Sequence, residues 1–215
     1  MNEDLEMLVP QVRRDILRMV HTVNSGHPGG SLGCVEFFVT LYERILEGDG
    51  NQRDMFILSN GHISPVYYST LARSGYFDIK ELDTFRKINS RLQGHPTNHD
   101  GLPGINISSG SLGQGVSVGL GIALSKKLNN DPSLVYVLTG DGELQEGQNW
   151  EAFMYASANK VDNIIVTVDF NGQQIDGSTE DVLDIGDLNQ KFESFGWKVL
   201  EVDKGNSLDM IYETL

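Results

Sequence analysis

Hydrophobic and polar positions along the chain follow two periods, one typical of helices and one typical of buried strands. Short apolar runs predict strands over residues 55–59, 135–139, 164–169 and 198–202. Apolar residues three and four apart predict helices over residues 5–24, 31–46, 64–74, 78–88, 115–128, 146–160 and 187–195, with a last helical start after Asn206. Helices that alternate with short strands predict an α/β fold of three layers, in which helices flank a mostly parallel sheet.

Several local features refine these helices. Ser31 is expected to cap the second helix and Asp78 the helix over residues 78–88. Pro10 is expected either in a first turn or as a break before the main N-terminal helix, and residues 176–181 as a polar loop. The apolar face of the N-terminal helix should hold Leu5, Leu8, Val12, Ile16, Leu17, Val20 and Val23.

The helix over residues 115–128 contains two interior glycines, Gly119 and Gly121. A glycine inside a helix costs roughly 1 kcal/mol relative to alanine. We therefore expect close packing against another backbone at both positions.

The stretch around Asp141 has the pattern strand, tight turn, helix, strand. The first strand stops at Gly140-Asp141-Gly142 and the second at Asn171, with 28 residues between Gly142 and Asn171. A right-handed crossover would make the strands parallel, so both oxygen-bearing side chains should emerge at the carboxyl edge of the sheet. That arrangement suits a hard cation that holds a phosphate group. The alternative is a surface turn in which the aspartate only caps a helix.

Composition narrows the classes of ligand. A chain of 215 residues can bury one core, and its net charge of −14 argues against nucleic acid or an anionic membrane as a partner. An anionic ligand would need local donors or a metal ion. The single Cys34 excludes an intrachain disulfide, and no long apolar run suggests a signal or a membrane span. We expect a cytoplasmic protein.

Three histidines, His27, His62 and His95, each directly follow a glycine in a predicted loop. Neutral imidazoles can bond to phosphate oxygens or sugar hydroxyls and can carry protons near neutral pH. Exposed bystander histidines are the plain alternative. A zinc site is poorly supported, because the histidines are widely spaced and no cysteine accompanies them. A dinucleotide site is disfavoured as well, since no GxGxxG separates a strand from its helix.

At this point the motifs resemble a known family. The GDG…N pattern resembles the thiamine-diphosphate-binding signature, and its flanks resemble transketolase in particular. The matching segments are NSGHPGGSLG (24–33), LSNGHIS (58–64), QGHP (93–96), LPGINISSGSLGQG (102–115), GDGELQEGQNWEA (140–152) and QIDG (174–177). The resemblance implies the diphosphate-binding domain of a thiamine-diphosphate fold.

The resemblance also implies roles for the acidic turn. Asp141, Asn171 and the main-chain carbonyl of Gln173 would hold a divalent cation, Mg²⁺ or else Ca²⁺ or Mn²⁺, that bridges the cofactor's diphosphate. Gly142 would offer its N–H to the diphosphate.

The histidines and the SSGSLGQG segment acquire roles in the same way. His62 resembles a contact to the diphosphate, whereas His27 and His95 resemble the catalytic histidines that face the reactive carbon and the ketose hydroxyls. Gly110 and Leu112 resemble the pair that lines the cofactor's aminopyrimidine.

The implied reaction transfers a two-carbon ketol unit from a ketose, usually a phosphate, to an aldose. Transketolases also need a glutamate from a second, pyrimidine-binding domain, and no part of this chain corresponds to it. We therefore expect residues 1–215 to be a diphosphate-binding domain without its C-terminal end, from a split transketolase or a truncated product.

In a split transketolase the partner would be a C-terminal transketolase subunit in an α2β2 assembly, with Glu146 resembling an interface residue. A dipole-stabilised carboxylate at a helix N-terminus is the plain alternative for Glu146. For the whole chain, two alternatives remain, a catalytically silent scaffold subunit or else a deoxyxylulose-phosphate-synthase-like subunit.

Overall fold

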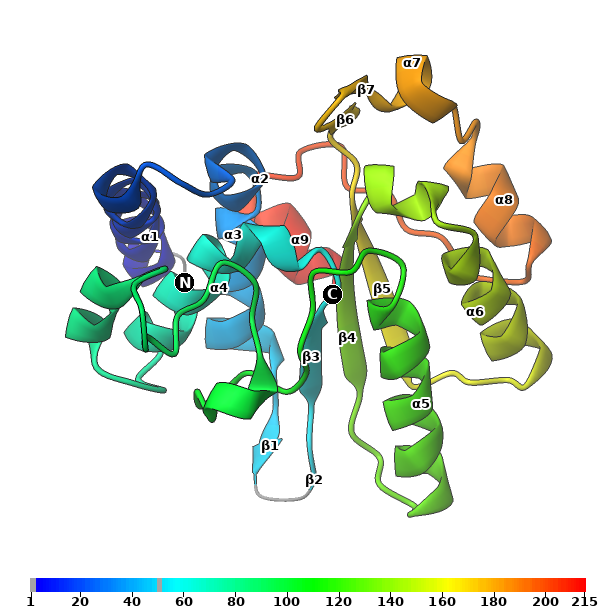
Figure 1. Ribbon diagram of the computed structural model, residues 1–215. Helices are drawn as coiled ribbons and strands as arrows, with labels where there is room; N and C mark the ends of the chain where they lie inside the picture. Colours follow the sequence, from blue (N-terminus) through cyan, green and yellow to red (C-terminus); the bar gives the residue numbers. More distant parts are fainter. Residues whose placement is uncertain (1–2, 50–51) are drawn as a thin grey trace. The chain divides into compact units, whose positions relative to one another are not determined.

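The computed structural model describes residues 3–49 and 52–215. The chain folds into two compact units, which are described separately below (Figure 1). Unit 1 comprises Met1–Leu46, Gly61–Gly110 and Glu201–Leu215, and unit 2 comprises Glu47–Asn60 and Ser111–Leu200.

Unit 2 is built on a parallel sheet of three strands in the order β3 (Met55–Leu58), β4 (Val135–Gly140) and β5 (Ile164–Asp169). Figure 1 shows these strands side by side. Gly140 pairs with Asp169 in the register of β4 and β5, so the two strands end together. The parallel sheet that the apolar runs predict is confirmed.

Helices flank this sheet. The helix α5 (Gly115–Leu128) packs on β4 and on α6 (Gly147–Ala158), and both helices begin and end close to their predicted limits. The remaining elements of unit 2 are the hairpin strands β1 (Gly48–Asp49), β2 (Gln52–Arg53), β6 (Gln173–Gln174) and β7 (Gly177–Ser178), the 3₁₀ turn η5 (Gly142–Gln145), and the helices α7 (Thr179–Leu183) and α8 (Leu188–Ser194). An α/β fold with helices around a parallel sheet is thus confirmed.

The two glycines of α5 have different environments. A Cβ on Gly119 would lie 2.6 Å from Cγ2 of Val137 in β4, so the helix packs closely there, but against a side chain and not against the expected backbone. A Cβ on Gly121 would meet no atom within 4 Å, and the expectation is wrong for this position. Only one glycine is required by the packing of the helix on the sheet.

Unit 1 is helical, and its core forms where α1 (Glu3–Val23) packs on α3 (Val35–Thr40) and α4 (Ser64–Arg73). The other elements of unit 1 are α2 (Pro28–Gly33), the π turn η1 (Leu41–Ile45), the 3₁₀ turns η2 (Gly61–Ile63), η3 (Ile79–Thr84) and η4 (Asn98–Asp100), and α9 (Leu208–Thr214). Val12 and Ile16 of α1 are fully buried, whereas Leu17, predicted on the same face, is 52% exposed.

Two predicted helices are shorter or broken. The helix expected over residues 31–46 begins earlier, because Pro28 occupies the first turn of α2, and it is divided at Cys34. Ser31 lies inside α2 and donates to the carbonyl of His27 at 2.8 Å, so its predicted capping role is wrong. The helix expected over residues 78–88 is only the 3₁₀ turn η3, although Asp78 does cap it by accepting from the N–H of Lys80.

Three further predictions need correction. Residues 198–202 form no strand in the part of the chain that is described, and Leu200 is 56% exposed. Residues 176–181 are not simply a loop, because they contain β7 and the start of α7, whose N-terminus Ser178 caps. Pro10 lies well inside α1, which begins at Glu3. The helix there faces solvent at Glu6, so water can satisfy the carbonyl that proline leaves without a donor.

Within residues 3–49 and 52–215, no helix has both the length and the apolar character needed to cross a lipid bilayer.

Candidate functional site

Two of the predicted catalytic and cofactor-binding histidines lie against each other in unit 1. His27 immediately precedes α2, and His62 lies in η2 before α4. Their ring centroids are 5.1 Å apart and the rings meet edge to face at 71°. Segments 35 residues apart in the chain therefore bring their imidazoles together.

Each glycine that precedes a histidine has its own structural reason. Gly26 has a φ of +137°, a backbone conformation that side chains disfavour. A Cβ on Gly61 would lie 2.8 Å from the backbone nitrogen of Gly110, and one on Gly94 would lie 2.6 Å from Cζ of Arg86. Backbone conformation thus requires glycine at position 26, and close approaches require it at positions 61 and 94.

His95 lies on Gly110. A Cβ on Gly110 would be 2.7 Å from Cδ2 of the His95 ring, and Gly110 has a φ of +135°. The predicted catalytic histidine and the predicted cofactor-binding glycine are therefore in direct contact. Their roles toward a cofactor stay predictions.

The three imidazoles are held neutral. Burial lowers the pKa of His62 to about 4, and the neighbouring His27 and His95 contribute to this lowering. Burial also lowers the pKa of His27 and of His95, and in both cases the guanidinium of Arg86 adds to the effect. Neutral imidazole carries one donor and one acceptor, which suits hydrogen bonds to sugar hydroxyls and phosphate oxygens.

In unit 2, Asp141 lies at the carboxyl end of β4 and is 1% exposed. Its N–H donates to the carbonyl of Asp169 at 3.2 Å, which continues the pairing of β4 with β5. Its carboxylate accepts from the N–H of Gly142 at 2.8 Å and from the N–H of Gly172 at 2.7 Å. Burial raises the pKa of Asp141 more than these two hydrogen bonds lower it, so a nearby cation would favour its charged form.

Asn171 and Gln173 lie on either side of the Gly172 amide that Asp141 binds. Asn171 donates through Nδ2 to Asp169 at 2.9 Å, and its Oδ1 accepts from the N–H of Gln173 at 2.9 Å. The predicted metal ligands thus gather at one edge of the sheet. They offer a carboxylate, an amide oxygen and a carbonyl, a set that fits a hard divalent cation.

Gly142 and Leu112 complete the predicted set. Gly142 is crowded, because a Cβ there would lie 2.9 Å from Cβ of Gln174. Its N–H, predicted to bind the diphosphate, donates to Asp141 in this structure. Leu112 is half-buried in the loop before α5. The cofactor roles of both residues stay predictions.

Sequence reasoning missed Glu143, a carboxylate that is 2% exposed. Its Oε1 accepts from the hydroxyl of Ser59 and from the N–H of Gly113, and its Oε2 accepts from the N–H of Gly140. Burial raises its pKa more than these hydrogen bonds lower it. Glu143 therefore joins the end of β3, the loop before α5 and the end of β4. In the sequence it resembles an ordinary acidic residue near a helix start, and only its place inside a glycine-rich turn hints otherwise.

Glu146, by contrast, is exposed and forms the N-cap of α6 without a side-chain hydrogen bond to the helix. The plain alternative, a carboxylate at a helix N-terminus, describes its surroundings in the chain. Its predicted place in a dimer interface stays a prediction.

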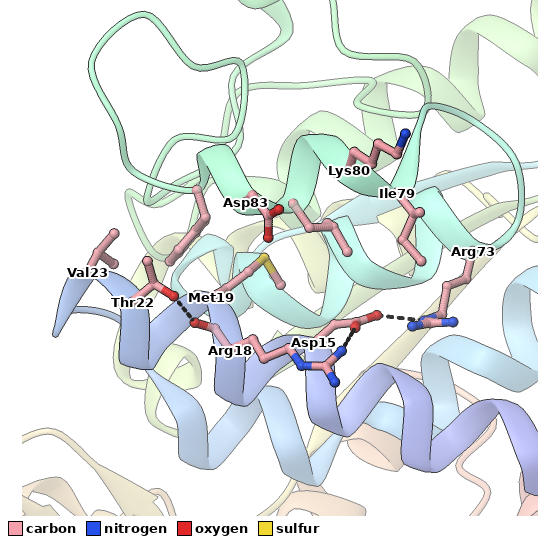
Figure 2. A pocket seen from close by; sticks show the side chains of 11 residues that line it. Asp15, Arg18, Met19, Thr22, Val23, Arg73, Ile79, Lys80 and Asp83 are labelled. Carbon is pink, nitrogen blue, oxygen red and sulfur yellow. Dashed lines mark hydrogen bonds and ion pairs between the residues drawn. The ribbon is translucent and has the colours of Figure 1, made fainter.

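A hollow of about 250 Å³ in unit 1 lies apart from the predicted residues, none of which lines it (Figure 2). Asp15 is one of the residues that line it, and it accepts from Arg73 Nε at 2.6 Å and from the hydroxyl of Ser69. Arg18 lies 3.6 Å from the same carboxylate. Lys80 also lines the hollow, and none of the predicted site residues reaches it, so we assign it no ligand.

Comparison with known proteins agrees with this geometry. The family model described as "Transketolase, thiamine diphosphate binding domain" matches residues 6–215. The chain is 38% identical to one subunit of the apulose-4-phosphate transketolase of Actinobacillus succinogenes, over 99% of this chain and 79% of that one. It is 36% identical to a 6-deoxy-6-sulfo-D-fructose transketolase subunit of a Clostridium species, over 97% of this chain and 77% of that one.

A solved transketolase from Campylobacter jejuni superimposes with a TM-score of 0.90 at 32% identity, over 99% of this chain and 35% of that one. The sheet, the placement of the motifs at its edge and in the histidine loops, and these matches agree. The chain belongs to the transketolase family, and it matches the thiamine-diphosphate-binding domain of that family.

Proposed function

We propose that this chain is the diphosphate- and metal-binding subunit of a thiamine-diphosphate-dependent transketolase and works with a separate pyrimidine-domain subunit. The observation that carries the proposal is the similarity to separate transketolase subunits. The chain is 38% and 36% identical to two relatives whose names describe them as subunits of transketolases. Residues 1–215 form one domain in this proposal, which the family match over residues 6–215 supports.

Within this proposal, Asp141, Asn171 and the carbonyl of Gln173 hold Mg²⁺, and the metal holds the cofactor's diphosphate. Gly142 and His62 contact the diphosphate, since both can approach it closely or donate to it. The burial of Asp141 supports the metal assignment, because burial disfavours its charged form even with two N–H donors present, and a cation offsets that cost.

Thiamine diphosphate supplies the carbon centre that stabilises an acyl carbanion equivalent. The protein's part is to bind and orient. Gly110 and Leu112 line the aminopyrimidine, and the neutral His27 and His95 bond to hydroxyls of the ketose and aldose. The lowered pKa keeps both rings neutral at neutral pH, so each can accept a proton from a sugar hydroxyl and return it from the imidazolium form.

The substrates in this proposal are a ketose and an aldose that carry a terminal anion. The names of the two relatives specify a phosphate in one case and a sulfonate in the other. Each cofactor would be shared between this chain and a C-terminal transketolase subunit, in an α2β2 assembly. We assign the complex to the cytoplasm, on the basis of the single cysteine in the chain.

The test is reconstitution. We expect the purified chain alone to be inactive, and a mixture with a pyrimidine-domain subunit, thiamine diphosphate and Mg²⁺ to transfer a ketol unit between sugar phosphates. Ketol transfer by the chain alone would contradict the split-subunit assignment. A complex that assembles and binds the cofactor but transfers nothing to phosphorylated or sulfonated acceptors would favour a silent scaffold subunit.

A further inference from the structure

Arg86 has a backbone conformation that its side chain disfavours. It follows η3 with a φ of +56°, in the left-handed region where residues other than glycine and asparagine are uncommon. Its N–H donates to the carbonyl of Leu92 at 2.8 Å, which closes the loop between them. Because this conformation is strained for a residue with a side chain, the surrounding structure must hold Arg86 there.

The guanidinium of Arg86 connects the segments that precede two of the histidines. Its Nη1 donates to the hydroxyl of Ser25 at 2.8 Å, two residues before His27. A Cβ on Gly94, the residue before His95, would lie only 2.6 Å from Cζ of Arg86. A side chain at position 94 would displace the guanidinium, so Gly94 is needed for this contact.

The charge of Arg86 has no acidic partner within hydrogen-bonding reach among the described residues. None of the ion pairs of the described chain includes it, and its buried Nε has no hydrogen-bond partner there. Its guanidinium also lies over the ring of Phe85, with Cζ 5.5 Å from the centroid. Arg91, by contrast, has an acidic partner, because its Nε and Nη2 each lie 2.8 Å from a carboxylate oxygen of Glu81.

We propose that Arg86 is a positioning residue of the ketol-transfer site, which ties the Ser25–His27 and Gly94–His95 segments together and directs a fixed positive charge at both imidazoles. The inference rests on the proposed function, because it assigns a purpose to the histidines of that site. The charged and titratable groups that face His27 are Arg86, His62 and His95, and those that face His95 are Arg86, His27 and His62.

This arrangement serves transfer chemistry in two ways. A cation beside each imidazole disfavours a second proton on the ring, so both histidines stay able to accept a hydrogen bond at neutral pH. The planar guanidinium also fixes the loops, because it bonds in one plane and cannot lose its proton. Burial acts in the same direction as the charge and is the larger cause of the lowered pKa of His27 and His95.

The experiment is an NMR titration of the ring Cε1–H signals in the 215-residue chain, with His27→Gln and His95→Gln used to identify the signals. Arg86→Gln should raise the pKa of both histidines by about 0.5 units or more, as a unit charge several ångströms away would require. Arg91→Gln is the matched control and should leave both pKa values unchanged. A folded Arg86→Gln chain with unchanged pKa values would overturn the proposal.

Arg86→Lys keeps the test decisive if Arg86→Gln does not fold. Lysine preserves the charge without the planar fork, so both pKa values should stay within about 0.2 units of those of the unaltered chain. A rise with lysine as large as that expected for glutamine would refute the electrostatic role. In the assembled enzyme, Arg86→Gln should move the acidic limb of the kcat/KM profile to higher pH, whereas Arg91→Gln should not.

The titration measures the pKa values of the two histidines in the chain and does not depend on enzymatic activity. If reconstitution fails while the histidine pKa values respond to Arg86 as expected, the proposed function fails and the coupling stands. If reconstitution succeeds and the pKa values do not respond, only the role of Arg86 is lost.

Discussion

The two units position their predicted site residues by different means. In unit 2, Asp141 directly follows β4, and Asn171 lies two residues after the end of β5. The main-chain pairing of Gly140 with Asp169 sets the separation of the two strand ends. In unit 1, His27 and His95 lie in loops whose placement depends on individual glycines and on side chains such as Arg86. Strand ends are positioned by main-chain hydrogen bonds that most residues can make, whereas such loops are positioned by particular side chains.

The electrostatics of the two units differ in the same way. Burial raises the pKa of Asp141, which makes unit 2 a place where a cation is favourable. Burial lowers the pKa of His62 to about 4, which makes unit 1 a place for neutral hydrogen-bonding groups. Unit 2 thus presents a buried carboxylate at the end of a strand, and unit 1 presents neutral imidazoles.

The predicted metal site in unit 2 should give the strongest response to substitution. Asp141→Asn should weaken Mg²⁺-dependent binding of thiamine diphosphate to the assembled complex by about 100-fold or more, since it removes the only carboxylate of the predicted ligand set. Isothermal titration calorimetry measures this affinity. The control is Asp162→Asn, an exposed carboxylate just before β5 that bonds to Lys127. Equal affinity in both variants would remove the metal assignment and, with it, the contrast between the units.

The next effect concerns the side chain that ties the strand ends of unit 2. Glu143→Gln should lower the free energy of unfolding by about 1–3 kcal/mol. The carboxylate of Glu143 accepts three hydrogen bonds, and the amide nitrogen of the substituted side chain would face at least one of these donors. Glu146→Gln, an exposed change of the same kind three residues on, should alter it by less than about 0.5 kcal/mol. Urea denaturation compares the two. If both variants lose the same free energy of unfolding, the hydrogen bonds of Glu143 add nothing and main-chain pairing alone holds these strand ends.

A third comparison tests how closely α5 packs on the sheet. Gly119→Ala places a methyl group 2.6 Å from Val137 and should destabilise the chain by about 1–3 kcal/mol. Gly121→Ala meets open space and should stabilise it by about 0.5–1 kcal/mol. Thermal unfolding of both variants should shift the midpoint in opposite directions. A raised midpoint in both variants would mean that Val137 can move aside and that the packing of α5 on the sheet does not require Gly119.

The weakest of the four responses is a pH dependence specific to unit 1. Folding lowers the pKa of His62 from 6.5 to about 4, so the unfolded chain binds more protons between these values. The contribution of His62 to stability is therefore present above pH 6.5 and is lost as the pH falls toward 4. His62→Gln should flatten the decline of the unfolding free energy between about pH 7 and about pH 4.5. Hydrogen exchange should locate the difference in α2 and α4, and protection changes confined to β4 and β5 would contradict it.

Much of the site was predictable because its motifs are local. The strands around Asp141, their parallel pairing and the convergence of Asp141 with the Asn171 segment follow from apolar runs and turn residues, and the structure confirms them. The Gly-His pattern singled out histidines that lie together, although the reason for each glycine emerged only from the packing. These features depend on neighbours in the sequence or on main-chain pairing, which pattern reasoning captures.

The α/β fold, the polar edge of the sheet at Asp141 and the family could all be inferred from the order of the amino acids. The side chains that support the site could not, and they emerged from the folded chain. Glu143 bonds to Ser59 across 84 residues, and Arg86 bonds to Ser25 across 61. Folding likewise leaves Gly119 packed and Gly121 open, and residues 198–202 without a strand. The physical reason is that side-chain partners and burial arise from contacts through space, and no local period records them.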